Sequence, residues 1–261
     1  MIRTFFITCM LLTSMVSAQK MGLVHYGQID SNGLKGPLGP DFNAYMTFNT
    51  NESYYVVAKD SLEKGKTFKT RYYSADGSRG ISLRGEMTTR YGRQVYRSLT
   101  KDSTYWNQWD GLYVAEKLPK INWELMNETK LFGKITARKA NGTYRGREYT
   151  AWYTMDIPLP FGPWKLHGLP GLILEAYDQD KEIYIYFKSI TYPLESNIEI
   201  SQVKRPDYHP QSWKSLEDFK KRLDRMYEHR KNSSILIAER MGTNVPERQI
   251  KREVFIESFD E

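Results

Sequence analysis

The side chains that could do chemistry in this sequence gather between residues 167 and 178. His167, Glu175 and Asp178 lie close together along the chain there. A histidine beside carboxylates can act as a general base, or it can bind a metal ion together with them. The commoner outcome for such a histidine is structural: it hydrogen-bonds a backbone carbonyl. We therefore treat these three residues as a possible polar site.

A second arrangement pairs Glu175 with Glu148. Both are expected on neighbouring strands, and two facing carboxylates can cleave a glycosidic bond by acid and base catalysis. A glutamate that points inward is as easily neutralised by Arg145 or Arg147. Because neighbouring strands bring many residues close, this pairing is weak evidence, and we expect no catalytic residue.

Other site chemistries find little support in the sequence. The four histidines, His25, His167, His209 and His229, lie far apart and form no H-x-H or H-E-x-x-H pair. No G-x-S-x-G frame marks a nucleophilic serine. The single cysteine, Cys9, lies in the first eighteen residues, so a chain that has lost them has no thiol chemistry and no disulfide. We expect neither a metal site nor a cofactor.

The most distinctive motif covers residues 168–173 and reads GLPGLI. Its glycines invite comparison with a phosphate-binding loop, but the Gly-Lys-Ser/Thr of that loop is missing, and a strand rather than a helix is expected next. A turn explains the same letters. Gly168 and Gly171 would supply unusual backbone dihedrals, and Pro170 fixes φ. We expect a type II turn with positive φ at Gly171.

Flanking residues extend the motif into a longer frame: Ala151-Trp152-Tyr153, Ile157-Pro158, Gly162-Pro163 and Asp178. On this frame the chain resembles the GLPGLI (Porph_ging) family of Bacteroidetes envelope proteins, over residues 120–190. The resemblance carries over no biochemical activity, because none is established for the family. We expect a structural role for the motif, with Trp164 and Leu169 filling the core; its positions are Trp152, Gly162, Pro163, Gly168, Leu169, Pro170, Gly171, Leu172 and Ile173.

The elements around the motif are expected to be strands. Residues 41–49 alternate apolar and polar side chains, which is the period of a half-buried antiparallel strand. Prolines between residues 154 and 172 predict a loop, since proline cannot donate to a ladder. Similar runs, separated by turn residues, predict further strands at 54–58, 68–73, 95–99, 112–118, 121–125, 147–154, 172–177 and 183–190.

Near the C-terminus the period becomes helical. Apolar residues recur at helical spacing from Trp213 to Tyr227, with Ser212 or Ser215 as the cap, and a weaker run covers 234–241. We predict a mainly β fold: a curved antiparallel sheet, half-barrel or sandwich-like, with a C-terminal amphipathic helix packed on it. The predicted organisation is a signal peptide at 1–18, a β-rich GLPGLI-type domain at 19–200 and a helical segment packed on it at 201–261.

Residues 1–18 have the pattern of a signal peptide. Arg3 precedes an apolar run at 5–12, and Val16-Ser17-Ala18 offers the small residues of a cleavage site. A membrane span needs about 20 apolar residues, more than any run in this chain has. We expect cleavage after Ala18 and an exported protein of the periplasm or outer envelope, with no transmembrane span.

The net charge and the predicted β structure leave two classes of function. The net charge is +7, one less once Arg3 is removed, and no basic stripe of a nucleic-acid module is present, so nucleic acid is not expected as a partner. The first class is a non-enzymatic envelope protein that holds a hydrophobic or peptide-like ligand in the concavity of the sheet. The second class is an interaction module accessory to an outer-membrane TonB-dependent transporter, a receptor that the resemblance loosely implies. A glycan-binding protein is a further alternative. A solvent-open apolar cavity would favour the first class, and a filled core with an exposed aromatic patch would favour the interaction module.

Overall fold

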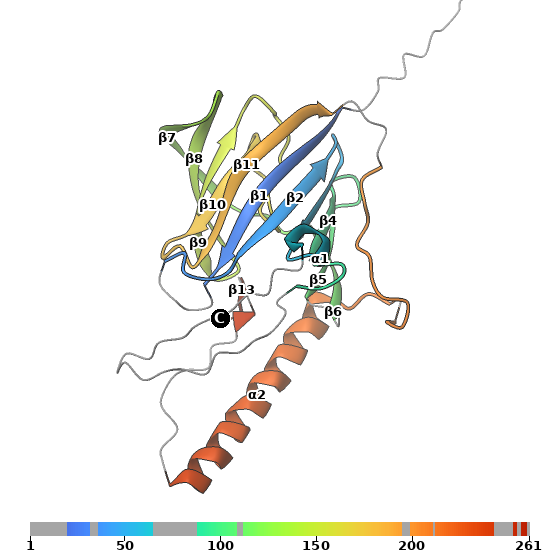
Figure 1. The fold of residues 1–261 in the computed structure, drawn as a ribbon, viewed down its shortest axis with the longest axis vertical. Helices are drawn as coiled ribbons and strands as arrows, with labels where there is room; N and C mark the ends of the chain where they lie inside the picture. The colour runs from blue at the N-terminus through green and yellow to red at the C-terminus, as the bar shows by residue number, and fades with distance from the viewer. Residues whose placement is uncertain are drawn as a thin grey trace, which may run out of the picture.

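The computed structural model describes residues 20–31, 36–64, 88–108, 112–194, 199–210, 212–242, 253–254 and 257–259. The expected leader at 1–18 and the expected strand at 68–73 lie outside these residues. Eleven strands form one antiparallel sheet (Figure 1). They are β1 (Met21–Asp30), β2 (Asp41–Phe48), β3 (Glu52–Val57), β4 (Arg93–Ser98), β5 (Ser103–Gln108), β6 (Leu112–Lys117), β7 (Trp123–Phe132), β8 (Ile135–Tyr144), β9 (Arg147–Thr154), β10 (Leu172–Asp178) and β11 (Ile183–Leu194).

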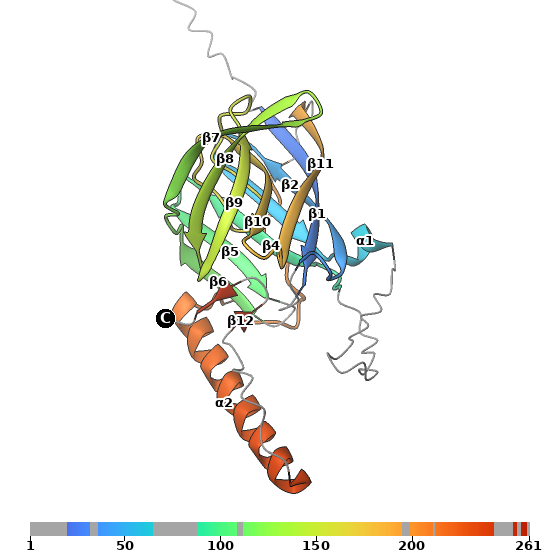
Figure 2. The ribbon, with the colours of Figure 1, turned by 90° about the vertical axis from the view of Figure 1, so that its left-hand side faces the viewer.

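The strand order makes the sheet a meander that turns back on itself. It runs β6-β5-β4-β3-β2-β1-β11-β10-β9-β8-β7, so every neighbouring pair is consecutive in sequence except β1 with β11. The two edge strands, β6 and β7, are themselves consecutive and are not paired. Figure 2 shows the strong curvature that results. The predicted class, a mainly β fold with a curved antiparallel sheet and a C-terminal helix, is confirmed.

The alternation predicted for residues 41–49 is present in β2. Phe42, Ala44, Met46 and Phe48 are buried, and the residues between them are partly exposed. The same alternation divides β3 and β4 between two clusters. One face joins the main core, while Tyr54, Val56 and Tyr96 on the other face form a second cluster with Ile200. The sheet therefore has apolar cover on both faces at these strands.

Strand β6 is an edge, and a short stretch before the C-terminal helix covers part of it. The Lys214 amide donates to the Tyr113 carbonyl (2.9 Å), and the Ala115 amide donates to the Lys214 carbonyl (2.9 Å). This parallel bridge satisfies backbone groups that an edge strand otherwise leaves open.

Helix α2 (Leu216–Met241) begins where the sequence predicted and contacts the sheet only at its start. Ser215 caps it, since its Oγ accepts the Asp218 amide at 3.1 Å. Phe219 and Leu223 are buried, whereas Met226 is 36% exposed and Leu236 is 58% exposed. The rest of the helix extends away from the sheet (Figures 1 and 2). The packing expected of its apolar stripe is thus limited to about two turns, and the weak run at 234–241 belongs to the same helix.

Three short elements complete the fold. Helix α1 (Asp60–Glu63) follows β3, and β12 (Glu253–Val254) pairs with β13 (Glu257–Ser258). This two-stranded pair is separate from the eleven-stranded sheet. Within the described part of the chain, no helix is both long enough and apolar enough to cross a membrane.

Candidate functional site

The motif loop, residues 155–171 between β9 and β10, fills the interior of the sheet. Phe161 packs against Phe48 of β2, and Trp164 packs against Tyr144 of β8. Leu166 and Leu169 are buried beside them. Because the loop contacts strands from both halves of the meander, it forms part of the core. This agrees with the expectation that Trp164 and Leu169 fill the core.

Four successive carbonyls of the motif loop each accept a side-chain hydrogen bond. Arg97 Nη2, from β4, donates to the carbonyls of Trp164 (3.1 Å) and Leu166 (3.5 Å). Trp123 Nε1, from β7, donates to the His167 carbonyl (2.7 Å). His167 Nδ1 donates to the Lys165 carbonyl (2.9 Å). The loop is therefore held by polar contacts from opposite ends of the strand order as well as by its apolar side chains.

Arg97 is an unusual member of this set. It is 1% exposed, and its described hydrogen bonds go to Ser53 Oγ and to the two loop carbonyls rather than to a carboxylate. Burial lowers the pKa of its guanidinium to about 10, and the nearby Tyr144 opposes this shift. A charge buried without a carboxylate is costly, so the two carbonyls are the groups that offset its desolvation.

The two glycines of the motif are needed for different reasons, and one expectation was wrong. Positive φ occurs at Gly168 (+90°) and not at Gly171, so the type II turn with positive φ at Gly171 is not formed. Gly171 instead lies against β9, where a β-carbon would come within 2.1 Å of the Thr154 carbonyl oxygen. The unusual dihedral expected at Gly168 is therefore present, and the one expected at Gly171 is not, because the sequence does not show this backbone approach.

The remaining motif positions line the same region. Gly162, Pro163, Leu172 and Ile173 are buried, as is Trp152 at 9% exposure, while Gly168 and Pro170 reach the surface. A β-carbon on Gly162 would lie 2.7 Å from Ile173 Cδ1. The Ile173 carbonyl accepts a hydrogen bond from the Tyr26 hydroxyl (2.8 Å).

His167 is buried and neutral. Burial, reinforced by the charge of Arg97, lowers the pKa of its imidazole to about 4, against the opposing hydrogen bonds of the Lys165 and Pro119 backbone. Its Nδ1 is used within the motif loop. It therefore has the commoner role expected for it, a hydrogen bond to a backbone carbonyl.

The three residues of the possible polar site have separate partners. Glu175 accepts from Lys130 Nζ (2.7 Å) and from the Tyr184 hydroxyl (3.3 Å). Asp178 accepts from Arg147 Nη1 (2.7 Å). These carboxylates are three residues apart on one strand, so they project from opposite faces. The structure does not join them with His167 into one site.

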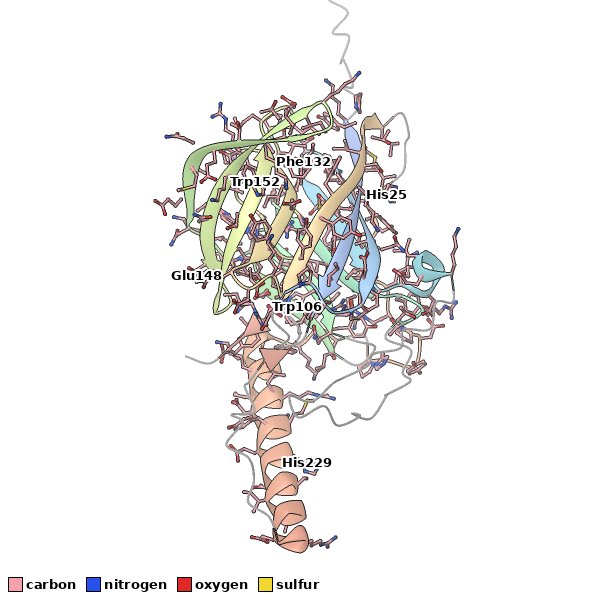
Figure 3. All side chains as sticks on the ribbon, turned by 60° about the vertical axis from the view of Figure 1, so that its left-hand side comes forward. His25, Trp106, Phe132, Glu148, Trp152 and His229 are labelled. Atoms are coloured by element: carbon pink, nitrogen blue, oxygen red, sulfur yellow. The ribbon has the colours of Figure 1, made fainter. Side chains whose placement is uncertain are left out.

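The pairing of Glu148 with Glu175 is also absent. Glu148 is exposed and lies opposite Thr143, while Glu175 lies opposite Trp152, four residues farther along β9. Four residues of a strand span about 13 Å, which exceeds the carboxylate separations of glycosidases. Figure 3 shows Glu148 near one end of the sheet and Trp152 farther along it. His25 on the sheet and His229 on α2 lie far apart in the same view.

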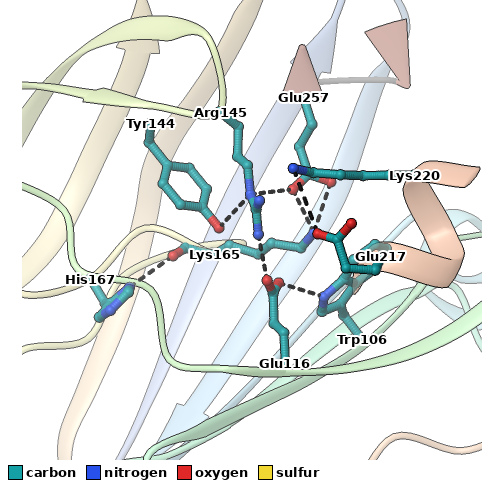
Figure 4. Close-up of polar contacts among 9 residues, drawn as sticks. All are labelled: Trp106, Glu116, Tyr144, Arg145, Lys165, His167, Glu217, Lys220 and Glu257. Atoms are coloured by element: carbon teal, nitrogen blue, oxygen red, sulfur yellow. Dashed lines mark hydrogen bonds and ion pairs between the residues drawn. The ribbon is translucent and has the colours of Figure 1, made fainter. Parts of the chain in front are cut away.

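A second set of buried charges, the base cluster, lies where the sheet meets α2 (Figure 4). It consists of Trp106, Glu116, Arg145, Lys165 and Glu257. Lys165 Nζ donates to both oxygens of Glu257 (2.7 and 2.8 Å). Arg145 bonds Glu116 and lies 3.3 Å from Glu257, and Trp106 Nε1 donates to Glu116 (2.8 Å). Two cations thus face two carboxylates.

The base cluster is deeply buried around Lys165. The Lys165 and Glu257 side chains are 3% and 2% exposed, and the ammonium lies 3.2 Å from the centre of the Trp106 ring. Burial lowers the pKa of Lys165, and the Glu257 carboxylate opposes this most strongly. An adjoining cavity of about 20 Å³ is lined by Gln28, Arg93, Gln94, Asn107 and Trp164, and it has room for about one water molecule.

Sequence reasoning missed this cluster. Glu257 is 92 residues from Lys165 and Arg145 is 29 residues from Glu116, and no spacing rule links them. The one available signal was Lys165 itself, a charged residue between the apolar Trp164 and Leu166.

An exposed aromatic patch lies beside the start of α2. Arg205 lies over the rings of Tyr113 (4.5 Å) and Trp213 (4.3 Å), and Trp213 makes an edge contact with Tyr105 (4.9 Å). Tyr208 is 80% exposed and Trp213 is 36% exposed. Tyr208 joins the group through His209, whose ring lies against both Tyr208 (4.9 Å) and Tyr113 (5.8 Å). We call these residues, Tyr105, Arg205, Tyr208 and Trp213, the aromatic patch.

Fold and site together define an open antiparallel meander whose interior is occupied by its own motif loop. Residues 142–175 match the family described as "Protein of unknown function (Porph_ging)". The resemblance predicted from the GLPGLI motif is confirmed over that segment. The comparison with curated proteins finds no match.

The comparison with solved structures finds proteins to which this chain is similar at low identity. Two structures of PNGF-II, in different space groups, are 13% identical to this chain, with TM-scores of 0.48 and 0.47. Each match covers 77% of this chain but only 33% or 32% of the PNGF-II chain. The chain thus spans about a third of the length of these proteins.

In the described residues, no group of three or more His, Cys, Asp or Glu side chains could hold a metal ion.

Proposed function

We propose that this protein is an exported, non-enzymatic component of the cell envelope that acts as an interaction module. The observation that carries the proposal is a filled interior combined with an exposed aromatic patch. Of the two classes that the sequence left open, this combination favours docking on a partner over holding a hydrophobic ligand in the concavity.

The filled interior leaves little room for a hydrophobic ligand. Pockets for small molecules commonly have volumes of about 300–1,000 Å³, whereas the cavity beside the base cluster has about 20 Å³. The space that a ligand would need is taken by Phe161, Trp164, Leu166 and Leu169 of the motif loop, all buried. Moving the motif loop out of this space would require breaking the hydrogen bonds that Arg97 and Trp123 donate to it.

The outer surface offers accessible area for binding, which the filled interior lacks. The aromatic patch exposes Tyr208 and Trp213 beside Arg205, and these three residue types are enriched in protein interfaces. Helix α2 begins next to the patch and leaves the sheet after Leu223. Both features present contact area to a partner outside the core.

The partner we propose is an outer-membrane receptor of the TonB-dependent transporter class, which the family resemblance implies. The test is photo-crosslinking in the native envelope. A photo-reactive residue at Tyr208 should give a crosslink to such a receptor. The matched control places it at Leu131 on β7, which is 69% exposed but outside the patch, and should give none.

Two results would contradict the proposal. One is equal crosslinking from both positions, which would show that the patch has no preference for a partner. The other is the absence of any crosslink from Tyr208 in a protein that is correctly exported and folded.

A further inference from the structure

Residues 257–259 lie at the base of the sheet and place one carboxylate inside it. Glu257 is 1% exposed and accepts both of its short hydrogen bonds from Lys165. Phe259, two residues on, lies against the Phe219 ring of α2 (5.8 Å) and against the Arg145 guanidinium (5.3 Å). The carboxylate and the ring are therefore received by one continuous site.

The residues that contact this segment belong to the sheet, the motif loop and α2. The segment itself belongs to none of these three elements. Strand β13 pairs with β12 and not with the eleven-stranded sheet. Its described contacts with the rest of the protein include the Glu257 ion pairs with Lys165 and Arg145 and the packing of Phe259 on Phe219 and the main core. Glu257 and Phe259 are thus held by side-chain contacts to the sheet, the motif loop and α2, as the side chains of a bound peptide would be.

The charges of the base cluster show why a carboxylate is needed there. Glu116 is already bonded by Arg145 and Trp106. Lys165 bonds Glu257 and lies over the Trp106 ring. Without Glu257, the cluster would keep two cations against one carboxylate in a desolvated place, which is strongly unfavourable. The site therefore selects an anionic oxygen pair.

We propose that the base cluster is a recognition site for a peptide carboxylate that stands two residues before an aromatic ring, and that residues 257–259 occupy this site in cis. The ligand class is an acidic, aromatic segment of a partner protein. The role depends on the proposed function as an interaction module, but the site itself does not. The cis segment acts as a tethered competitor, because a short tether gives an effective concentration in the millimolar range.

The test measures binding of a labelled nonapeptide with the sequence of residues 253–261, Glu-Val-Phe-Ile-Glu-Ser-Phe-Asp-Glu. Fluorescence anisotropy is recorded with the full-length wild type and with the full-length Glu257→Gln variant. The variant, whose own segment is weakened, should bind the peptide about tenfold or more tightly than the wild type. A peptide with Gln at the position of Glu257 should bind neither protein.

Further variants keep the test decisive if Glu257→Gln folds poorly. Phe259→Ala leaves the charges of the base cluster balanced, and it should also bind the peptide more tightly than the wild type. A Lys165→Met, Glu257→Gln double variant should lose peptide binding, whereas Glu253→Gln should behave as the wild type. Thermal melts establish that each variant is folded.

Three outcomes would overturn the proposal. The first is equal binding of the Glu and Gln peptides. The second is no peptide binding by folded Glu257→Gln and Phe259→Ala variants. The third is a concentration-dependent dimer of the wild type that Phe259→Ala abolishes, because the segment would then be exchanged between copies instead of acting in cis. None of these outcomes affects the crosslinking at Tyr208, so the two proposals fail separately.

Discussion

Gly168 and Gly171 differ in what a side chain would meet. At Gly171 a β-carbon would lie 2.1 Å from the Thr154 carbonyl oxygen, so β9 and the motif loop would have to separate. At Gly168 the nearest atom is 3.9 Å away, and only the positive φ opposes a side chain. The first problem is one of packing between elements, and the second is a local backbone strain.

We predict that Gly171→Ala lowers the free energy of unfolding by about 2 kcal/mol or more, as overpacking against backbone does. Gly168→Ala should cost about 1 kcal/mol, the range for a strained dihedral. Denaturant melts of both variants check that Gly171→Ala is the more destabilising of the two substitutions. A Gly171→Ala protein as stable as the wild type would contradict the close approach of this glycine to the Thr154 carbonyl.

His167 gives the molecule a specific loss of stability in acid. Its pKa falls from 6.5 in the unfolded chain to about 4 in the folded one, mainly through burial. Between these values the unfolded chain binds the extra proton, so stability falls as the pH falls from 6.5 towards 4. This shift corresponds to about 3 kcal/mol.

We predict that His167→Gln removes this acid-dependent loss, because its amide is uncharged at every pH. Unfolding free energies measured from pH 7 to pH 4 should fall less steeply in the variant than in the wild type. The matched control is His229→Gln on the exposed part of α2, which should follow the wild-type curve. Parallel curves for wild type and His167→Gln would contradict the burial of a neutral imidazole.

For single residues, the sequence predicted burial and the usual role of a side chain better than it predicted which groups the side chain contacts. The burial of Trp164 and Leu169 and the carbonyl bond of His167 followed from composition and common chemistry. The close approach of Gly171 to β9, the bonds of Arg97 to the loop and the Lys165–Glu257 pair did not. Each depends on which strand lies opposite in space, which local spacing does not record.

Among the elements, α2 divides into a packed start and an exposed remainder. We predict that Phe219→Ala lowers the free energy of unfolding by about 3–5 kcal/mol, the usual cost of deleting a buried ring. Leu236→Ala, at 58% exposure, should change it by about 0.5 kcal/mol or less. Urea melts of the two variants compare them directly. Equal losses would mean that the far part of α2 packs on the protein.

The strands next to the motif were predictable because their alternation or β-branched content is strong. The predicted range 147–154 coincides with β9, and β10 and β11 begin at the predicted residues. Strands β1, β5 and β8 were missed. In β8, Lys139, Asn141 and Gly142 obscure the alternation, and in β1 the buried Gln28 and two glycines do the same. Pairing with neighbours stabilises these strands despite weak local preference.

For the whole molecule, the base cluster connects the end of the chain to the core. We predict that Glu257→Gln lowers the free energy of unfolding by about 3 kcal/mol, since it leaves Lys165 charged and buried. Adding Lys165→Met in the same chain should restore most of the loss, because both charges are then gone. Denaturant melts of Glu257→Gln, of Lys165→Met and of the double variant measure the coupling energy between Lys165 and Glu257. Additive losses would show that the two side chains do not interact.

The motif loop occupies the interior of the sheet, and we propose that partners therefore bind outside it. Native mass spectrometry of the protein purified from its own envelope tests this most directly. We predict that the mature polypeptide is recovered without a bound small hydrophobic molecule, and that a Trp164→Ala, Leu166→Ala variant, which enlarges the interior, gains affinity for a fluorescent fatty acid that the wild type does not bind. Recovery of the wild type with a stoichiometric hydrophobic ligand would contradict the account.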